Sequence, residues 1–105
     1  MKIKWSSFAL NAMFNTLDYV EEHFGRTARN NLTSSINHTK ALLRKQPLIG
    51  QIEQLLDDSL IQYRSILVSD VNRIVYYVDK NYIIFVDFWD MRRDPDFLAK
   101  RISNY

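Results

Sequence analysis

Apolar and polar residues follow two different periods along this chain. The opening stretch "KIKW" (residues 2–5) alternates polar and apolar side chains, which predicts a short strand. In residues 9–24, and again in residues 28–43, apolar positions recur three or four apart, so each stretch predicts a helix with one apolar face. After residue 59 the period falls to two, and β-branched and aromatic residues become frequent. The chain therefore divides into a helical half and a sheet-forming half.

Small polar residues and a glycine mark where the two helices begin and end. Ser6 or Ser7 is placed to cap the first helix, and Gly25 is placed to end it in a left-handed conformation. Thr27 is the predicted cap of the second helix, which ends before Pro47. Because the turn between them is very short, the two helices are predicted to pack as a hairpin.

Three further strands are predicted at residues 60–68, 71–78 and 82–89, separated by the turn residues "SD" and "DKN". Such short connections predict an antiparallel meander. The last strand carries large apolar residues on both faces, so it is expected inside the sheet with both sides covered. Strict alternation would put Tyr82, Ile84, Val86 and Phe88 on one face, and Ile83, Phe85 and Trp89 on the other.

The remaining segments complete the predicted order. The connector at residues 50–59 has room for one helical turn, and Asp94 can cap a last short helix with Pro95 at its first position and Leu98 facing inward. The predicted fold is α+β in one domain (residues 1–105), in the order β-α-α-β-β-β-α. It has an antiparallel sheet with the helical hairpin on one face, followed by a short C-terminal helix.

Composition favours a soluble cytoplasmic domain. The chain has 105 residues, of which 47% are hydrophobic, and this suits one compact core. It has no cysteine, which excludes a disulfide framework and thiol catalysis and fits a reducing compartment. No apolar run approaches about 18 residues and the start lacks a secretory leader, so no membrane association is expected. The formal charge of +2 permits a nucleic-acid partner without requiring one.

Few residues suit metal or cofactor chemistry. The chain has two glycines and no glycine loop that would cradle a phosphate. The two histidines, His23 and His38, occupy polar settings on different predicted helices and are interpreted as surface or cap residues. Neither a metal site nor a cofactor is expected.

Two aspartates of the last strand are less ordinary. Asp87 interrupts an apolar strand, where an unpaired carboxylate would be costly, and Asp90 follows at the strand end. The first interpretation is a structural ion pair with Arg73, Arg92 or Arg93, and the second is a general-base role.

Four arginines lie in or at the end of the predicted meander, namely Arg64, Arg73, Arg92 and Arg93. Strand pairing can bring several guanidinium groups onto one surface, and their planar shape suits bidentate contact with phosphates or carboxylates. Alternatively, the first two are structural residues whose charges are neutralised by the two aspartates of the last strand.

Aromatic residues exceed what one small core must bury. They include Phe8, Phe14, Tyr19, Tyr76 and Tyr77. If they are exposed together, they mark a protein interface. The alternative is that they close the core over the sheet face that the helices leave open.

The segments "YRSILV", "NRIVYYV" and "YIIFVDFWDMRRDP", the last followed by a leucine, form a recognisable series. The series resembles the C-terminal half of the RelE/ParE superfamily toxins of bacterial type II toxin-antitoxin systems, which include plasmid stabilisation proteins. The opening strand and helical hairpin match the same order of elements. The resemblance implies a toxin that inhibits growth, is neutralised by an antitoxin encoded beside it, and can form a homodimer.

Two mechanisms are known in that superfamily. ParE-like members are not enzymes; they bind DNA gyrase, trap its cleaved complex with DNA and block replication. RelE-like members are endoribonucleases that cut mRNA on the ribosome without a metal, while basic side chains stabilise the phosphorane formed by attack of the ribose 2′-OH. An inactive remnant of the toxin fold is a third alternative.

The two patterns match this sequence to different extents. The RelE pattern gives Arg73 and Arg92 as catalytic candidates, but carboxylates replace the lysines expected before the strands, at Glu53, Asp57 and Asp58. Its final-helix tyrosine falls near Phe97 or Leu98, and Tyr63 or Tyr105 would have to replace it. The ParE pattern needs an arginine turn, Asp-Pro and a leucine, all of which are present, so a gyrase-binding toxin is expected first and a nuclease second. The expected target-binding residues are Arg64, Arg73, Trp89, Arg92, Arg93, Asp94, Pro95 and Leu98.

Overall fold

The computed structural model of the protein describes residues 1–56 and 60–91. In chain order its elements are β1 (Lys2–Trp5), α1 (Ser7–Phe24), α2 (Arg26–Lys45), β2 (Gln51–Ile52), the 3-10 helix η1 (Gln54–Leu56), β3 (Arg64–Leu67), β4 (Asn72–Asp79) and β5 (Tyr82–Asp90). The order agrees with the predicted α+β fold. The C-terminal helix predicted after Asp94 lies outside the described residues.

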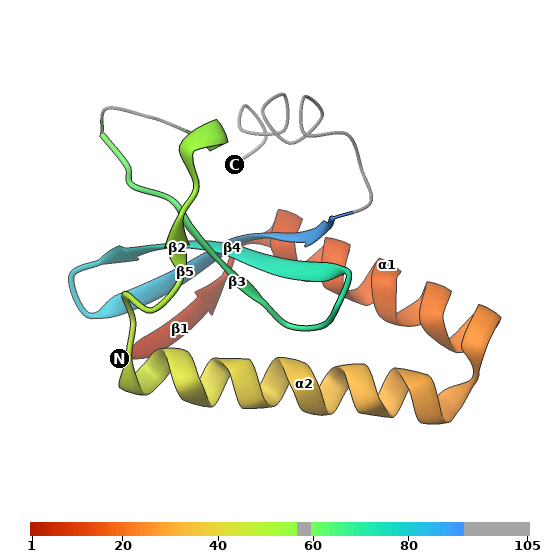
Figure 1. Cartoon of the computed structure of the whole chain (residues 1–105). Coiled ribbons are helices and arrows are strands. Elements are labelled where there is room, and N and C mark those ends of the chain that lie inside the picture. The colour runs from red at the N-terminus through yellow and green to blue at the C-terminus, as the bar shows by residue number, and fades with distance from the viewer. Residues whose placement is uncertain (57–59, 92–105) are drawn as a thin grey trace.

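The five strands form one mixed sheet in the order β1-β5-β4-β3-β2. The last three strands of the chain form the predicted antiparallel meander. β1 instead runs parallel to β5, with Ile3 opposite Ile83. The sheet is therefore mixed, whereas an antiparallel sheet was predicted. Parallel neighbours cannot be joined by a hairpin, and here the connection contains the rest of the fold. β5 is consequently an interior strand, and both helices lie on the same side of the sheet (Figure 1).

Local chemistry explains the helix boundaries. Ser6 precedes α1, and its Oγ accepts a hydrogen bond from the backbone N–H of Ala9 at 3.0 Å, which confirms it as a cap. Gly25 alone separates α1 from α2, with φ 93° and ψ 173°, a backbone region essentially restricted to glycine. The prediction of Thr27 as the second cap was wrong, because α2 already begins at Arg26 and Gly25 occupies the cap position.

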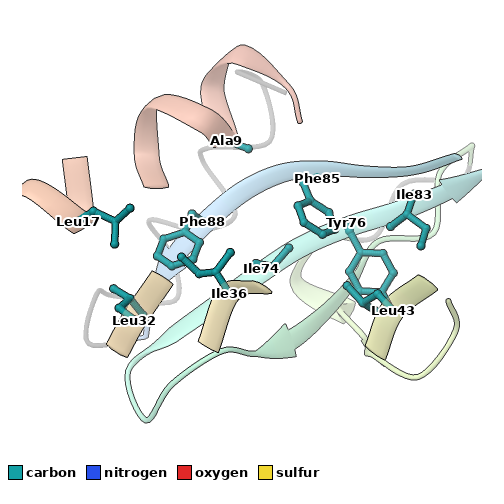
Figure 2. Close-up of a cluster of buried hydrophobic side chains, with 10 residues drawn as sticks. All are labelled: Ala9, Leu17, Leu32, Ile36, Leu43, Ile74, Tyr76, Ile83, Phe85 and Phe88. Carbon is teal, nitrogen blue, oxygen red and sulfur yellow. The ribbon is translucent and has the colours of Figure 1, made fainter. Parts of the chain in front are cut away.

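The larger core lies between the helices and the sheet. Figure 2 shows Leu32 and Ile36 of α2 beside Phe88 of β5, and Leu43 of the same helix beside Tyr76 of β4. All five side chains are buried. Each such burial contributes roughly 1.5–3 kcal/mol, so α2 is held against the sheet along most of its length.

A β-bulge in β5 changes which side chains face the helices. The pairing with β4 slips between Val75 and Tyr76, which leaves Val86 as an extra residue on β5. Beyond this point Phe88 belongs to the helix-side core and Trp89 to the opposite face. The predicted facings of these two residues were wrong, because strict alternation does not survive an inserted residue.

A smaller core covers part of the sheet face opposite the helices. Its buried members are Leu56, Tyr63, Val75, Val86 and Trp89. Leu56 belongs to η1, which is the single helical turn predicted in the connector. Both faces of β5 are therefore packed, as its apolar residues predicted.

Candidate functional site

Arg73 lies on the sheet face that the helices leave open. It pairs across the sheet with Leu67 and Trp89, and it precedes Ile74, which faces the helices. Its Nη1 lies 3.3 Å from Oε2 of Glu53 and donates to Oγ of Ser65 at 3.0 Å. The Ser65 hydroxyl in turn donates to the same Glu53 oxygen at 2.8 Å. A guanidinium, a carboxylate and a hydroxyl thus form a closed triangle of contacts.

Partial burial strengthens this triangle. The exposed fraction of the side chain is 19% for Arg73 and 11% for Glu53, so little water competes for their contact. Their charges compensate each other. The Nε of Arg73 is buried and has no hydrogen-bond partner in the described part of the chain, so one donor of the guanidinium is not used.

Backbone contacts hold Glu53 in position. It follows the edge strand β2, and its N–H donates to the carbonyl of Tyr63 at 2.9 Å. The Tyr63 ring packs edge-on against Tyr77, with 5.9 Å between the ring centroids. The sequence indicates Glu53 only as a carboxylate at a position where the RelE pattern has a lysine. The connector that carries it has no strong periodicity, so its approach to Arg73 had no signal in the sequence.

Arg64 has a different environment from Arg73. It pairs with Tyr76, which faces the helices, and its Nη1 donates to the carbonyl oxygens of Leu48 at 3.2 Å and Gly50 at 2.9 Å. Arg64 thereby fastens the loop that follows α2. The structure does not bring Arg64 and Arg73 together on one surface.

The end of β5 is mostly buried. Trp89 belongs to the smaller core, and Asp87 is fully buried, with its Oδ1 accepting a hydrogen bond from the N–H of Phe88 at 2.8 Å. Arg73 forms its ion pair with Glu53. The other expected site residues, Arg92, Arg93, Asp94, Pro95 and Leu98, lie outside the described residues, as do the ion pairs predicted between the two arginines and Asp87 or Asp90.

A groove of about 800 Å³ runs between α1 and the end of β5. Its walls combine aromatic side chains from Phe8, Tyr19, Phe24 and Phe88 with the amides of Asn11, Asn15 and Asn72. The predicted aromatic excess is therefore divided: Tyr76 is buried in the core, whereas Phe14 and Tyr19 are each 46% exposed on α1. Phe24, which was not in the predicted set, is 67% exposed. Tyr19 and Phe24 both line the groove, with ring centroids 6.5 Å apart, whereas Phe14 is exposed on α1 outside it.

The two histidines are exposed. His23 stacks on Tyr19, with ring centroids 4.1 Å apart, and its Nδ1 lies 2.9 Å from the Tyr19 carbonyl oxygen. Across the ranges 1–56 and 60–91, no three His, Asp or Glu side chains come together as ligands for a metal ion. In the same ranges, no helix has the length and apolar character required to cross a membrane.

Comparison of this geometry with known proteins identifies structural relatives but no close sequence relatives. No protein-family model matches the sequence. No curated protein matches it either. Among solved structures, the chromosomal ParDE TA system from P. aeruginosa superposes with a TM-score of 0.67 at 13% identity, over 86% of this chain and 95% of that chain.

Two further structures support the same fold. The YoeB dimer from Staphylococcus aureus gives a TM-score of 0.55 at 23% identity, over 83% of this chain and 92% of that chain. The YoeB/ParE toxin from Agrobacterium tumefaciens gives 0.57 at 15% identity, over 86% and 98%. The chain therefore has the fold that these ParE and YoeB proteins share, across nearly their whole length.

Proposed function

We propose that this chain is the toxin of a bacterial type II toxin-antitoxin system, acting in the cytoplasm and neutralised by a cognate antitoxin encoded beside it. The observation that carries the proposal is the fold, which spans 92–98% of the ParE and YoeB chains compared above. The exposed aromatic side chains of α1 and the adjoining groove support it, because they offer apolar area to a protein partner.

The favoured mechanism is ParE-like: the toxin binds DNA gyrase, blocks replication and catalyses no reaction. The ion pair of Arg73 supports this mechanism. Its guanidinium is already compensated by Glu53 and largely shielded from solvent, so it offers little net positive charge to an incoming phosphate. The proposed target surface is formed by Arg92, Arg93, Asp94, Pro95 and Leu98. Trp89 is buried in the smaller core, so it would support this surface from beneath and not contact the target.

The order in which macromolecular synthesis stops tests the mechanism. After induction in bacterial cells, incorporation of labelled thymidine should fall within minutes, before incorporation of labelled amino acids. If amino-acid incorporation stops first, the gyrase mechanism is wrong and the nuclease mechanism replaces it. Unimpaired growth despite accumulation of folded protein would leave only the inactive remnant, and the toxin proposal would fail.

A ribosome-dependent endoribonuclease is the second candidate, and the Arg73–Glu53–Ser65 triangle favours it. A carboxylate held beside a guanidinium can accept a proton from a ribose 2′-OH while the arginine contacts the phosphate. The partial burial of both groups keeps the carboxylate oriented. The roles would fall to Glu53 as general base and Arg73 as phosphate ligand.

Glu53→Gln separates the two candidates, because it keeps the shape of the side chain and removes the basic carboxylate. In a nuclease, loss of a general base should slow mRNA cleavage by about 10²-fold or more. In a gyrase binder the same variant should inhibit thymidine incorporation as strongly as the wild type. Arg26→Ala is a suitable control, since Arg26 is 84% exposed at the far end of the helical hairpin and should affect neither readout.

A further inference from the structure

The positive charges of the described chain are concentrated at one end of the molecule. This end is formed by the last turns of α2, by β1, by the start of β3 and by the turn between β4 and β5. We call it the basic end, and its cations are Lys2, Lys4, Lys40, Arg44, Lys45, Arg64 and Lys80. Asp79 is the one carboxylate on these elements within the described ranges.

Specific contacts bring these elements together. The N–H of Lys2 donates to the carbonyl of Asn81 at 3.1 Å, which places the start of β1 beside the turn that contains Lys80. Leu43 of α2 packs in one cluster with Tyr76 and Ile83, as Figure 2 shows. The contacts of Arg64 with the loop after α2 place its guanidinium at the same end. In Figure 1 the N-terminus lies next to the end of α2.

The rest of the described chain has the opposite balance. Its carboxylates are Asp18, Glu21, Glu22, Glu53, Asp70, Asp87 and Asp90, and its cations are Arg26, Arg29 and Arg73. Each of these three arginines forms an ion pair with a carboxylate. None of the seven cations of the basic end forms an ion pair within residues 1–56 and 60–91. The formal charge of +2 for the whole chain conceals this separation.

Local structural roles account for only part of this cluster. Arg44 and Lys45 lie in the last turn of α2, where positive charge offsets the helix dipole. Lys4 places its Nζ 4.0 Å above the ring of Tyr82, and it remains exposed. Lys80 has no such explanation. It occupies a left-handed position with φ 54°, which suits glycine or asparagine better than lysine.

We propose that the basic end binds the phosphate backbone of double-stranded nucleic acid. Five of its seven cations are lysines, which act as compact point charges, and they are spread over several elements. Such a distribution suits a polyanion with regularly spaced charges, since contacts to phosphates require no pocket. Binding should be independent of base sequence and strongly weakened by salt. Binding of the purified protein to a bare duplex can be measured whether or not the chain acts as a toxin, so the two proposals can fail separately.

The test compares two variants with the same net charge. Lys40→Gln, Arg44→Gln and Lys45→Gln together remove three charges from the basic end, and glutamine preserves the helix. Asn30→Asp, Asn31→Asp and Ser34→Asp together lower the net charge equally, on exposed positions in the first half of the same helix. Thermal unfolding monitored by circular dichroism establishes that both variants are folded.

Binding is measured by fluorescence polarisation with a labelled 20-base-pair DNA duplex between 50 and 200 mM KCl. The basic-end variant should bind at least about tenfold more weakly, and its slope of log Kd against log salt should fall by about 2 to 3. The control variant should stay within about threefold of the wild type. Equal loss in both variants would show that binding follows net charge alone and would overturn the proposal, as would no binding by the folded wild type at 50 mM KCl.

A polyglutamate peptide of matched charge is the competing probe. Weaker binding of the peptide than of the duplex is the expected result. Binding of the peptide as tight as that of the duplex would overturn the nucleic-acid proposal and assign the basic end to an acidic protein.

Discussion

Tyr76 connects the core to the loop that carries β2. Its ring is buried against Phe85, and its hydroxyl donates to the carbonyl of Pro47 at 2.8 Å and accepts from the N–H of Gly50 at 2.9 Å. Burial raises the pKa of Tyr76 above its ordinary value, while the hydrogen bond from Gly50 and the charge of Arg64 act in the opposite direction. One phenol therefore positions the loop that leads to Glu53.

The raised pKa of Tyr76 predicts a loss of stability in alkali. Unfolded tyrosine releases its proton near pH 10, whereas the folded state retains it to higher pH, so unfolding releases a proton and becomes easier as pH rises above about 10. Tyr76→Phe should cost about 1–3 kcal/mol at pH 7.5, because it leaves the loop groups unpaired. It should also lose less stability than the wild type between pH 7.5 and 10.5 in urea unfolding. Equal losses of unfolding free energy in the wild type and in Tyr76→Phe over this pH range would contradict the prediction. Tyr19→Phe, which replaces an exposed tyrosine, serves as the control.

Individual side-chain facings were the least predictable feature at this scale. The strand that carries Arg73 was recognisable from its apolar pattern, but its partner Glu53 lies 20 residues earlier in an irregular connector. Arg64 and Arg73 lie on neighbouring strands and face opposite sides, because pairing sets Arg64 opposite Tyr76 and Arg73 opposite Leu67. The pairing register of two strands decides which side chains share a face of the sheet, and that register depends on contacts between residues distant in sequence.

At the scale of elements, the helices and the meander were predictable because each rests on a repeated local pattern. The periodic apolar stripe located α1 and α2 to within a few residues, and the Ser6 cap agreed with it. The β-bulge at Val86 had no such pattern, since an extra residue in an apolar run looks like one more strand residue. The two-residue strand β2 was equally hidden, because its pairing with β3 comes from tertiary contacts.

The two glycines of the chain should respond differently to alanine. At Gly25 there is no atom within 4 Å of an added Cβ, so Gly25→Ala should cost only the backbone strain of φ 93°, about 1–3 kcal/mol. At Gly50 an added Cβ would lie 2.6 Å from the Tyr76 hydroxyl and 2.8 Å from the Ser65 carbonyl oxygen.

Gly50→Ala should therefore move the loop as well as destabilise the fold. We expect the backbone amide hydrogen at position 50 to lose its protection from hydrogen exchange in Gly50→Ala. Gly25→Ala should leave exchange at position 50 unchanged. Retained protection at position 50 in the alanine variant would show that the loop adapts without releasing Tyr76.

At the scale of the whole molecule, α1 exposes several large apolar side chains, three of which are aromatic. Phe14 and Tyr19 are each 46% exposed and Phe24 is 67% exposed, and the rings of Tyr19 and Phe24 contact each other. Apolar area of this kind on a small domain is a common mark of a protein interface. An antitoxin or a second copy of the chain would remove these rings from water.

Substitution of these rings should change association and leave folding intact. Without a partner, the purified wild type should self-associate as its concentration rises, because the rings are then buried between copies. Phe14→Ser with Phe24→Ser should sediment as a monomer at the same concentration, and its free energy of unfolding should change by no more than about 0.5 kcal/mol. Asn30→Ser with Asn37→Ser on the outer face of α2 is the matched control. Identical sedimentation of the two double variants would exclude these rings from self-association.

The parallel pairing of β1 with β5 also determines when the fold can first be completed during synthesis. Lys2 pairs with Tyr82, so β1 leaves the ribosome about 80 residues before its partner strand. At roughly 5–20 residues per second, that interval lasts about 4–16 s. During it the nascent helices have no completed sheet against which to pack. Each new chain therefore cannot complete its sheet, or act, until β5 has been synthesised.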